Sequence, residues 1–175
     1  MDGAIRSLAE KIRDVPDFPQ PGIIFKDITT LLKDPEAFSV AINKLTQPFK
    51  GMTIDLVVGM ESRGFIFGAP LAYNLGAGFV PVRKMGKLPA QAIRAEYALE
   101  YGTATLEIHE DAIKSGQKVL IIDDLLATGG TVSATIDLIE RLGGDVVAIA
   151  FLIELTFLNG REKLRGREVI SLIRY

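Results

Sequence analysis

The sequence contains no cysteine, which excludes disulfide bonds and thiolate metal sites. It also has no surplus of basic residues: the formal net charge is −2, whereas nucleic-acid-binding proteins usually carry a clustered excess of lysine and arginine. The longest apolar run, Val146 to Ile153, is far too short to cross a bilayer, and the first residues show no apolar core of a secretory signal. We therefore expect a cytoplasmic protein that binds neither nucleic acid nor membranes.

Two common nucleotide-binding motifs are missing as well. No Gly-Lys-Ser/Thr follows a glycine-rich run, so the chain lacks the phosphate loop of nucleoside triphosphatases, and the three spaced glycines of the dinucleotide fingerprint are absent. His109 is the only histidine. Its position among Glu107, Glu110 and Asp111 favours a surface residue over a general base.

The pattern of apolar residues predicts an α/β fold. With 175 residues the chain is long enough for one domain with a proper core and short for two, and no repeat or linker divides it. Strands alternate with helices, which predicts a single domain, residues 1–175, with a central, mostly parallel, twisted sheet flanked by helices. Strands are expected at residues 54–58, 78–82, 119–122, 146–153 and 169–173, and helices at 5–15, at 65–75, from Asp34 to Pro48, and after Thr131.

The stretch of residues 119–131 is the most informative part of the sequence. Its four leading apolar residues are typical of a strand buried on both faces of a sheet, and Asp123 and Asp124 end this run. Carboxylates at the end of a buried strand are costly without a partner. The two carboxylates could be compensated by the hydroxyl groups of a ligand, by a metal ion, or by both.

A loop of small residues follows the two acids. Gly129 and Gly130 can adopt backbone angles that aim successive N–H groups into one concavity, and the next helix adds its unpaired N–H groups and positive dipole end. With the hydroxyls of Thr128 and Thr131, these groups form a cradle for a phosphate dianion. An ordinary strand–turn–helix connection remains the alternative. Together with the acids, the loop favours a sugar phosphate as the ligand.

The segment Asp123-Asp-Leu-Leu-Ala-Thr-Gly-Gly-Thr131 closely resembles the ribose-phosphate binding motif of type I phosphoribosyltransferases, in the form typical of the branch that uses adenine. The resemblance implies that the loop binds the 5-phosphate of phosphoribosyl pyrophosphate and that the acids face the ribose hydroxyls. The residues it assigns to ribose 5-phosphate are Asp123, Asp124, Ala127, Thr128, Gly129, Gly130 and Thr131.

The segment of residues 17–28 is rich in proline and glycine, which argues against a regular element and favours a stiff, turned segment. By itself it could be a strap whose aromatic side chains fill the core, or a hood in which Phe25 stacks on a flat base. Phe18-Pro-x-Pro-Gly-x-x-Phe25-Lys-Asp resembles a second signature of the same branch and favours the hood, spanning about residues 1–34. It implies that adenine is bound by Ile24, Phe25, Lys26 and Leu125, although Lys26 stands where arginine is common.

Two further loops follow expected strands, residues 59–64 and 83–87. If the strands are parallel, both loops lie at the same edge of the sheet as the phosphate loop. Each could be a plain solvated turn, but pyrophosphate leaving C1 of ribose needs cations near its oxygens. The resemblance implies that pyrophosphate is bound by Ser62, Arg63, Arg83, Lys84 and Lys87. It also leads us to expect a non-proline cis peptide bond at Glu61–Ser62.

Residues 99–108 alternate in two halves around Gly102, which indicates a hairpin after an irregular stretch at 88–98. The hairpin could be a plain antiparallel flap or a lid that closes the site to water. The resemblance favours a flexible lid, at about residues 84–108, with Glu100 and Tyr101 as its functional residues. Glu100 is then the candidate proton acceptor, and the expected catalytic set is Glu100, Tyr101, Lys87 and Arg63.

Taken as a whole, the resemblance implies transfer of the 5-phosphoribosyl group from phosphoribosyl pyrophosphate to N9 of adenine, giving AMP and pyrophosphate in purine salvage. Mg²⁺ is expected to arrive with the pyrophosphate rather than in a protein cage, and a homodimer is expected. Sister enzymes for guanine, hypoxanthine or xanthine place a lysine where this chain has Ile153, Glu154 and Leu155. A regulator that only senses the donor or a purine is a second alternative, but no added nucleic-acid-binding domain or basic face is visible.

Overall fold

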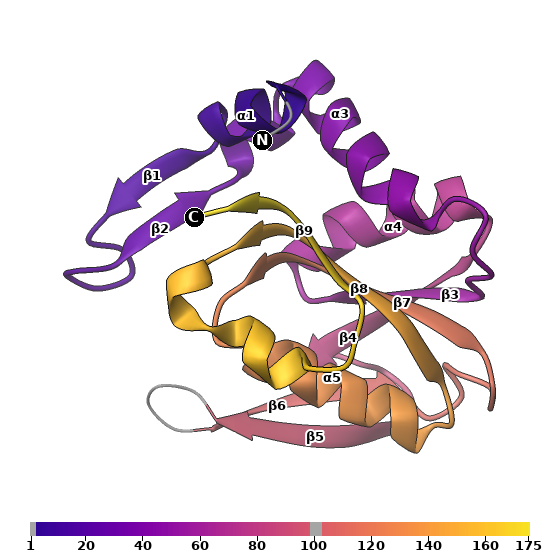
Figure 1. The fold of residues 1–175 in the computed structure, drawn as a ribbon. Helices are drawn as coiled ribbons and strands as arrows, with labels where there is room; N and C mark the ends of the chain where they lie inside the picture. The colour runs from indigo at the N-terminus through magenta and orange to yellow at the C-terminus, as the bar shows by residue number, and fades with distance from the viewer. Residues whose placement is uncertain (1–2, 99–102) are drawn as a thin grey trace.

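The computed structural model describes residues 3–98 and 103–175 (Figure 1). Its main sheet has seven strands in the order β5-β6-β4-β3-β7-β8-β9. Strands β4, β3, β7, β8 and β9 run parallel to one another, and the antiparallel hairpin of β5 and β6 extends the sheet beyond β4, with β6 antiparallel to β4. The strands span Leu56–Met60 (β3), Gly78–Lys84 (β4), Ala92–Ala98 (β5), Thr103–His109 (β6), Lys118–Leu126 (β7), Asp145–Glu154 (β8) and Val169–Arg174 (β9). The expected α/β class and largely parallel sheet are confirmed.

Helices cover both faces of the sheet (Figure 1). One face carries α1, α3 and α4, and the other carries α5. Strand β7 separates the two cores, because Leu120 and Ile122 pack beneath α3 and α4 while Val119 and Ile121 pack toward α5. This alternation explains why a strand buried on both faces is apolar at every position. The helices span Gly3–Glu10 (α1), Thr29–Leu32 (α2), Pro35–Thr46 (α3), Arg63–Leu75 (α4) and Gly130–Arg141 (α5), with short 3₁₀ turns at Gln47–Phe49 (η1), Thr156–Leu158 (η2) and Gly160–Leu164 (η3).

Helix α3 begins as the sequence predicts. The carboxylate of Asp34 accepts hydrogen bonds from the N–H groups of Glu36 and Ala37, both at 3.1 Å, and Pro35 occupies the first turn. Across residues 3–98 and 103–175, no helix has the combined length and apolar character that a bilayer span requires.

The N-terminal region differs from the prediction. Helix α1 ends at Glu10, and the chain then forms strand β1 (Arg13–Pro16), which pairs antiparallel with β2 (Ile24–Asp27). The predicted helix at 5–15 is therefore too long, and the stretch at 17–28 does contain a regular element. Its prolines and glycine fall in the connection, where Asp17 and Gly22 take positive φ angles and the Phe18–Pro19 bond is cis, so they turn the chain without interrupting either strand.

The lid hairpin is also longer than predicted. Strand β5 begins at Ala92, inside the stretch expected to be irregular, and pairs with β6 along its whole length. Ile93, Ala95 and Tyr97 alternate toward the core beneath α5, but small alanines at other positions weaken this signal in the sequence. His109, expected on the surface, is half-buried at the end of β6, and its Nε2 atom is enclosed without a hydrogen-bond partner in the described part of the chain.

Candidate active site

The loops predicted to bind ligand gather at one edge of the sheet. Strands β4, β3, β7 and β8 are parallel neighbours, so the segments that follow them lie side by side. The β1–β2 hairpin lies at the end of the molecule toward which β8 and β9 point (Figure 1). The fold therefore brings the hood and the predicted phosphate loop to the same end of the sheet.

The phosphate loop leaves its backbone donors unused. Between described residues, the N–H groups of residues 127–131 donate to no backbone or side-chain acceptor. Gly129 adopts a φ of +78° and precedes α5 without a side-chain cap, so the first N–H groups of the helix also face the loop. A small cavity of about 60 Å³ opens there. It is lined by Asp123, Leu125, Leu126, Ala127, Thr128, Gly129, Gly130, Thr131, Val132 and Phe151.

Asp123 and Asp124 lie within β7 rather than after it, because the strand continues to Leu126. Asp124 is only 4% exposed. Burial and the neighbouring charge of Asp124 raise the pKa of Asp123 well above its ordinary value. Burial also raises the pKa of Asp124, although Arg63 opposes this shift. From the residues that the structure describes, Asp123 accepts one hydrogen bond, from the N–H of Asp124 at 2.9 Å, so the acidic pair is poorly compensated by these residues.

Arg63 joins the acids to the hood. Its Nε atom lies 2.7 Å from Oδ2 of Asp124, but this oxygen accepts no hydrogen bond from the described residues. The guanidinium carbon of Arg63 lies 5.1 Å from the centre of the Phe25 ring. In this structure the side chain therefore spans the space between the expected base-binding and ribose-binding residues. Asp124 Oδ2 is enclosed and lacks a hydrogen-bond donor among the described residues, so a ligand hydroxyl would reach it only after Arg63 moves away.

The start of α4 approaches β7 closely because residue 64 is glycine. A Cβ atom at Gly64 would lie 2.9 Å from Oδ1 of Asp123 and 3.0 Å from the carbonyl oxygen of Ile122. The preceding Glu61–Ser62 bond is cis, as expected from the resemblance. Ser62 makes no side-chain cap to the helix. The loop thus sets Arg63 directly beside the acidic pair.

Two carboxylates that the sequence reasoning missed hold the cationic loop at residues 83–87. Glu61 accepts hydrogen bonds from Arg83 Nη2 at 3.1 Å and from the N–H of Lys84 at 3.0 Å. Glu107, which is 2% exposed, accepts from the N–H of Gly86 at 2.8 Å. Burial would raise the pKa of Glu61, but these donors bring it below its ordinary value, and the Gly86 N–H has the same effect on Glu107. Both groups therefore stay ionised at neutral pH.

The three cations of this loop differ in their availability. The guanidinium group of Arg83 is hydrogen-bonded within the protein: Nη2 donates to Glu61, and Nη1 donates to the carbonyl oxygen of Lys87 at 3.0 Å. In the described part of the chain, neither Lys84 nor Lys87 lies within ion-pair distance of a carboxylate. Lys84 and Lys87 are therefore the cations free to meet an anionic ligand.

In the hood, Phe25 packs edge-on against Phe18, with ring centres 5.2 Å apart, and Ile24 is exposed. The ammonium group of Lys26 lies 2.6 Å from Oδ1 of Asp14 and 3.8 Å from the centre of the Tyr175 ring. The side chain of Lys26 thus connects the hood to the residue that follows β9. Leu125, half-buried beside the acids, lines the phosphate cavity.

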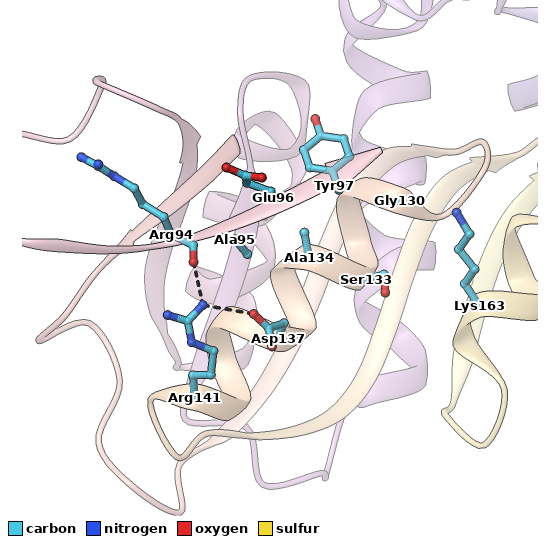
Figure 2. A pocket seen from close by; sticks show the side chains of 10 residues that line it. All are labelled: Arg94, Ala95, Glu96, Tyr97, Gly130, Ser133, Ala134, Asp137, Arg141 and Lys163. Atoms are coloured by element: carbon cyan, nitrogen blue, oxygen red, sulfur yellow. Dashed lines mark hydrogen bonds and ion pairs between the residues drawn. The ribbon is translucent and has the colours of Figure 1, made fainter. Parts of the chain in front are cut away.

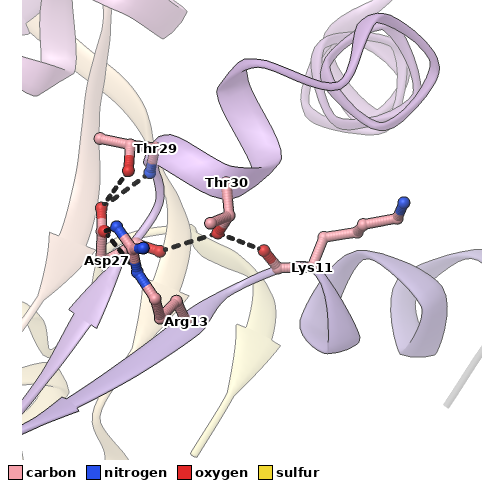
Figure 3. A network of polar contacts seen from close by, with 5 residues as sticks. All are labelled: Lys11, Arg13, Asp27, Thr29 and Thr30. Carbon is pink, nitrogen blue, oxygen red and sulfur yellow. Dashed lines mark hydrogen bonds and ion pairs between the residues drawn. The ribbon is translucent and has the colours of Figure 1, made fainter.

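The base of the hood is held by a polar network (Figure 3). Asp27 accepts hydrogen bonds from Arg13 and from both the N–H (2.9 Å) and the hydroxyl (2.7 Å) of Thr29. Thr30 donates to the carbonyl oxygen of Lys11 at 2.5 Å. The hydrogen bonds from Arg13 and Thr29 lower the pKa of Asp27 to about 2. The network fixes the angle at which the β1–β2 hairpin leaves the body of the protein.

A groove of about 490 Å³ separates β5 from α5 and reaches Gly130 (Figure 2). Arg141 crosses it, donating to the carbonyl oxygen of Arg94 at 2.6 Å and to Asp137 at 3.2 Å. The bond to Arg94 joins β5, the first strand of the expected lid, to α5, whereas the bond to Asp137 lies within α5. The expected lid residues Glu100 and Tyr101 lie outside the described residues.

Comparison with known proteins identifies the family. Residues 27–170 match the model of the phosphoribosyl transferase domain. The chain is 62% identical to an adenine phosphoribosyltransferase of Chloroflexus aurantiacus, over 97% of this chain and 98% of that protein. The crystal structure of the enzyme from Thermoanaerobacter pseudethanolicus aligns with a TM-score of 0.95 at 57% identity, covering 98% of this chain and 99% of that one.

A more distant relative has been solved with ligands. The adenine phosphoribosyltransferase of Saccharomyces cerevisiae, complexed with adenine and an iminoaltritol bisphosphate, aligns with a TM-score of 0.92 at 41% identity, over 98% of this chain and 99% of that one. The agreement extends over nearly the whole length of each chain. From its sequence, its fold and this arrangement of loops, the chain belongs to the adenine phosphoribosyltransferase family.

Proposed function

We propose that the cleft at this edge of the sheet carries out the family reaction, in which the 5-phosphoribosyl group of phosphoribosyl pyrophosphate is transferred to N9 of adenine, giving AMP and pyrophosphate. The observation that carries this proposal is the pairing of unused N–H groups at residues 127–131 with an incompletely hydrogen-bonded acidic pair on the same strand. A sugar phosphate is a ligand that can form hydrogen bonds with both the N–H donors and the acidic pair. It brings anionic oxygens to the loop and hydroxyl donors to the acids.

The first half of the site holds the sugar. Residues Ala127, Thr128, Gly129, Gly130 and Thr131 bind the 5-phosphate through N–H and hydroxyl donors. Asp123 and Asp124 accept hydrogen bonds from the ribose hydroxyls, which offsets the cost of burying two carboxylates. Their negative charge also favours the positive charge that develops on the ribose ring as pyrophosphate departs.

The second half neutralises the leaving group. Lys84 and Lys87 supply ammonium groups that no carboxylate of the described residues pairs with, and Ser62, which directly precedes α4, is assigned to pyrophosphate with them. Arg63 would leave Asp124 and Phe25 to contact pyrophosphate when substrates enter. Arg83 acts through its bonds to Glu61 and Lys87, which shape the loop.

Mg²⁺ fits this site as a companion of the donor. In the described residues, no group of three or more acidic or histidine side chains is arranged to hold a metal ion. Mg²⁺ usually keeps several waters and binds substrate phosphates together with one or two carboxylates. Asp123 and Asp124 are the carboxylates nearest the proposed donor site. The ion would spread the negative charge of the departing pyrophosphate.

Adenine is proposed to lie between Phe25 and Leu125, with backbone groups of Ile24 and Lys26 at its edge. The side chain of Lys26 is turned toward Asp14 and Tyr175, so the backbone is the part of this residue available to a base. At the end of β8, Glu154 is paired with Arg161 and no lysine is present at 153–155. The end of β8 therefore presents no lysine to a 6-oxo group, which favours a 6-aminopurine. Glu100 is the proposed acceptor of the N9 proton.

We further propose that the protein is a cytoplasmic homodimer. Tyr73 is 88% exposed and Ile66 37% exposed, and they lie two turns apart on one side of α4. Exposed apolar residues that share a helix face often mark an interface. Sedimentation velocity with Tyr73→Ser tests this: the native chain should sediment as a dimer and the variant should shift toward monomer.

One experiment tests the reaction against its alternatives. The protein is incubated with phosphoribosyl pyrophosphate and Mg²⁺, and adenine, guanine, hypoxanthine and xanthine are offered in turn. AMP from adenine alone supports the proposal. A nucleotide from a 6-oxopurine would support a sister enzyme, and binding of the donor without any product would support a regulator.

A further inference from the structure

A partly buried ion pair, formed by Glu154 and Arg161, lies behind the phosphate loop on the side of β8. Glu154 is the last residue of β8 and is 5% exposed. Its two carboxylate oxygens accept hydrogen bonds from Arg161, from Nε at 2.9 Å and from Nη2 at 2.5 Å. This two-point geometry fixes the orientation of both side chains. The reaction proposed above assigns neither residue a contact with substrate; Glu154 was named there only because no lysine stands at the end of β8.

The same guanidinium group also binds β9. Arg161 Nη1 donates to the carbonyl oxygen of Val169 at 2.9 Å, and Nη2 donates to the hydroxyl of Ser171 at 3.2 Å. Arg161 belongs to η3, a short 3₁₀ turn, whose hydrogen-bond geometry is poorer than that of an α-helix. The position of η3 therefore depends on how Arg161 is held by β8 and β9.

The residue before Arg161 touches the phosphate loop directly. A Cβ atom at Gly160 would lie 2.1 Å from the carbonyl oxygen of Ala127 and 3.0 Å from the nitrogen of Gly129. In the opposite direction, a Cβ atom at Gly129 would lie 2.6 Å from the carbonyl oxygen of Gly160. The backbones of the two segments are thus packed against each other with no side chain between them. A shift of Gly160 must move the residues that form the cradle.

We propose that the Glu154–Arg161 pair positions the phosphate cradle by holding Gly160 against Ala127 and Gly129. The pair never contacts substrate, so these are positioning residues and not catalytic ones. The inference rests on the proposed assignment of residues 127–131 to the 5-phosphate. Its specific consequence is that disturbing the pair weakens binding of the phosphate end of the donor and leaves the adenine site alone.

The test uses Glu154→Gln, which keeps the size of the side chain, and Arg161→Lys, which keeps its charge but loses the two-point geometry. We expect the KM for phosphoribosyl pyrophosphate and the calorimetric Kd for ribose 5-phosphate to rise about tenfold or more, because small misplacements of binding groups are costly. The KM for adenine should stay within about twofold. Gly160→Ala should give the same pattern by displacing the loop directly.

A matched control is the exposed pair of Arg167 and Glu140, whose Nη2 and Oε1 atoms lie 2.7 Å apart. Arg167→Lys and Glu140→Gln should bind ribose 5-phosphate as the native protein does. If Arg161→Lys fails to fold, ribose 5-phosphate binding by the Glu154→Gln variant tests the inference. Normal ribose 5-phosphate binding by folded Glu154→Gln overturns the inference, and so does an equal loss of donor and adenine binding together with a lowered Tm. If the native protein itself binds no ribose 5-phosphate, the proposed function is the part that fails.

Discussion

Arg63 pairs with Asp124 across the position expected for ribose: Nε and Oδ2 are 2.7 Å apart, and the same guanidinium covers the ring of Phe25. The contact gives a buried carboxylate a counter-charge while no substrate is present. It also occupies the space between the base and sugar sites. Arg63 must therefore move when both substrates bind, and its removal should change how Asp124 titrates.

The first prediction concerns the pH dependence of Arg63→Ala. Asp124 must be ionised to accept from a ribose hydroxyl, so activity should fall as the pH drops through its pKa. Burial raises this pKa and Arg63 opposes the increase, so removing Arg63 should move the acid limb of kcat/KM to higher pH. The profile is measured from pH 5 to pH 9. Arg63→Lys keeps the charge, so the acid limb of its kcat/KM profile should lie close to that of the native protein. An acid limb that does not move in Arg63→Ala would contradict the assignment of Asp124 to the ribose hydroxyls.

The second prediction is that Asp123→Asn is inactive yet more stable. The folded-state pKa of Asp123 lies above the unfolded one, so stability is lost as the pH rises through the folded-state pKa and the charge costs free energy at neutral pH. A gain of about 1 kcal/mol would raise Tm by about 2–4 °C. Calorimetry at pH 7 should show a higher Tm for Asp123→Asn than for the native protein, and this difference in Tm should become smaller as the pH is lowered. A lower Tm at pH 7 would mean that Asp123 stabilises the fold.

The third prediction addresses the free cations. Lys87→Ala and Lys84→Ala should each lower kcat by about 10²-fold, because each removes a charge that stabilises the departing pyrophosphate. Tm should not change, since neither ammonium group is paired in the described structure. Steady-state kinetics and the inhibition constant of pyrophosphate measure the effect. Lys50→Ala, at an exposed position outside the cleft, is the control and should match the native enzyme.

The fourth prediction tests the base of the hood through Asp27→Asn. The carboxylate has a pKa of about 2, below its unfolded value of 3.8, so its stabilisation is present above pH 3.8 and is lost as the pH falls through 2. The variant should melt a few degrees lower at pH 7, as expected for about 1 kcal/mol, and approach the native Tm near pH 2. Its KM for adenine should rise because Phe25 is displaced. An equal deficit at both pH values would argue against a charge effect.

Much of the fold could be predicted because its signals are local. The apolar residues from Val119 to Ile122 indicate a buried strand by themselves, and Asp34 followed by Pro35 marks a helix start. The phosphate loop was found for the same reason, since its glycines, threonines and acids are contiguous. The cis bond at Glu61–Ser62 was expected only from the resemblance.

The features that were missed depend on partners far apart in the chain. Arg13 would continue a helix by spacing, but its partner Asp27 and the pairing of Val15 with Phe25 make it part of a strand. Glu107 looked like part of a charged surface, yet it binds the N–H of Gly86, 21 residues away. Arg83 could not be told from its lysine neighbours until Glu61 was seen beside it.

The contact of Lys26 with Tyr175 has a consequence for how the protein is made. The hood comes from the first part of the chain, but the aromatic ring over its lysine follows β9, and the hydroxyl of that ring donates to the carbonyl oxygen of Ala9. A ribosome therefore produces the hood, the proposed adenine-recognition segment, early and its support almost 150 residues later. Nascent chains arrested before β9 should carry an unsupported hood, so competence to recognise the base arises only late in synthesis.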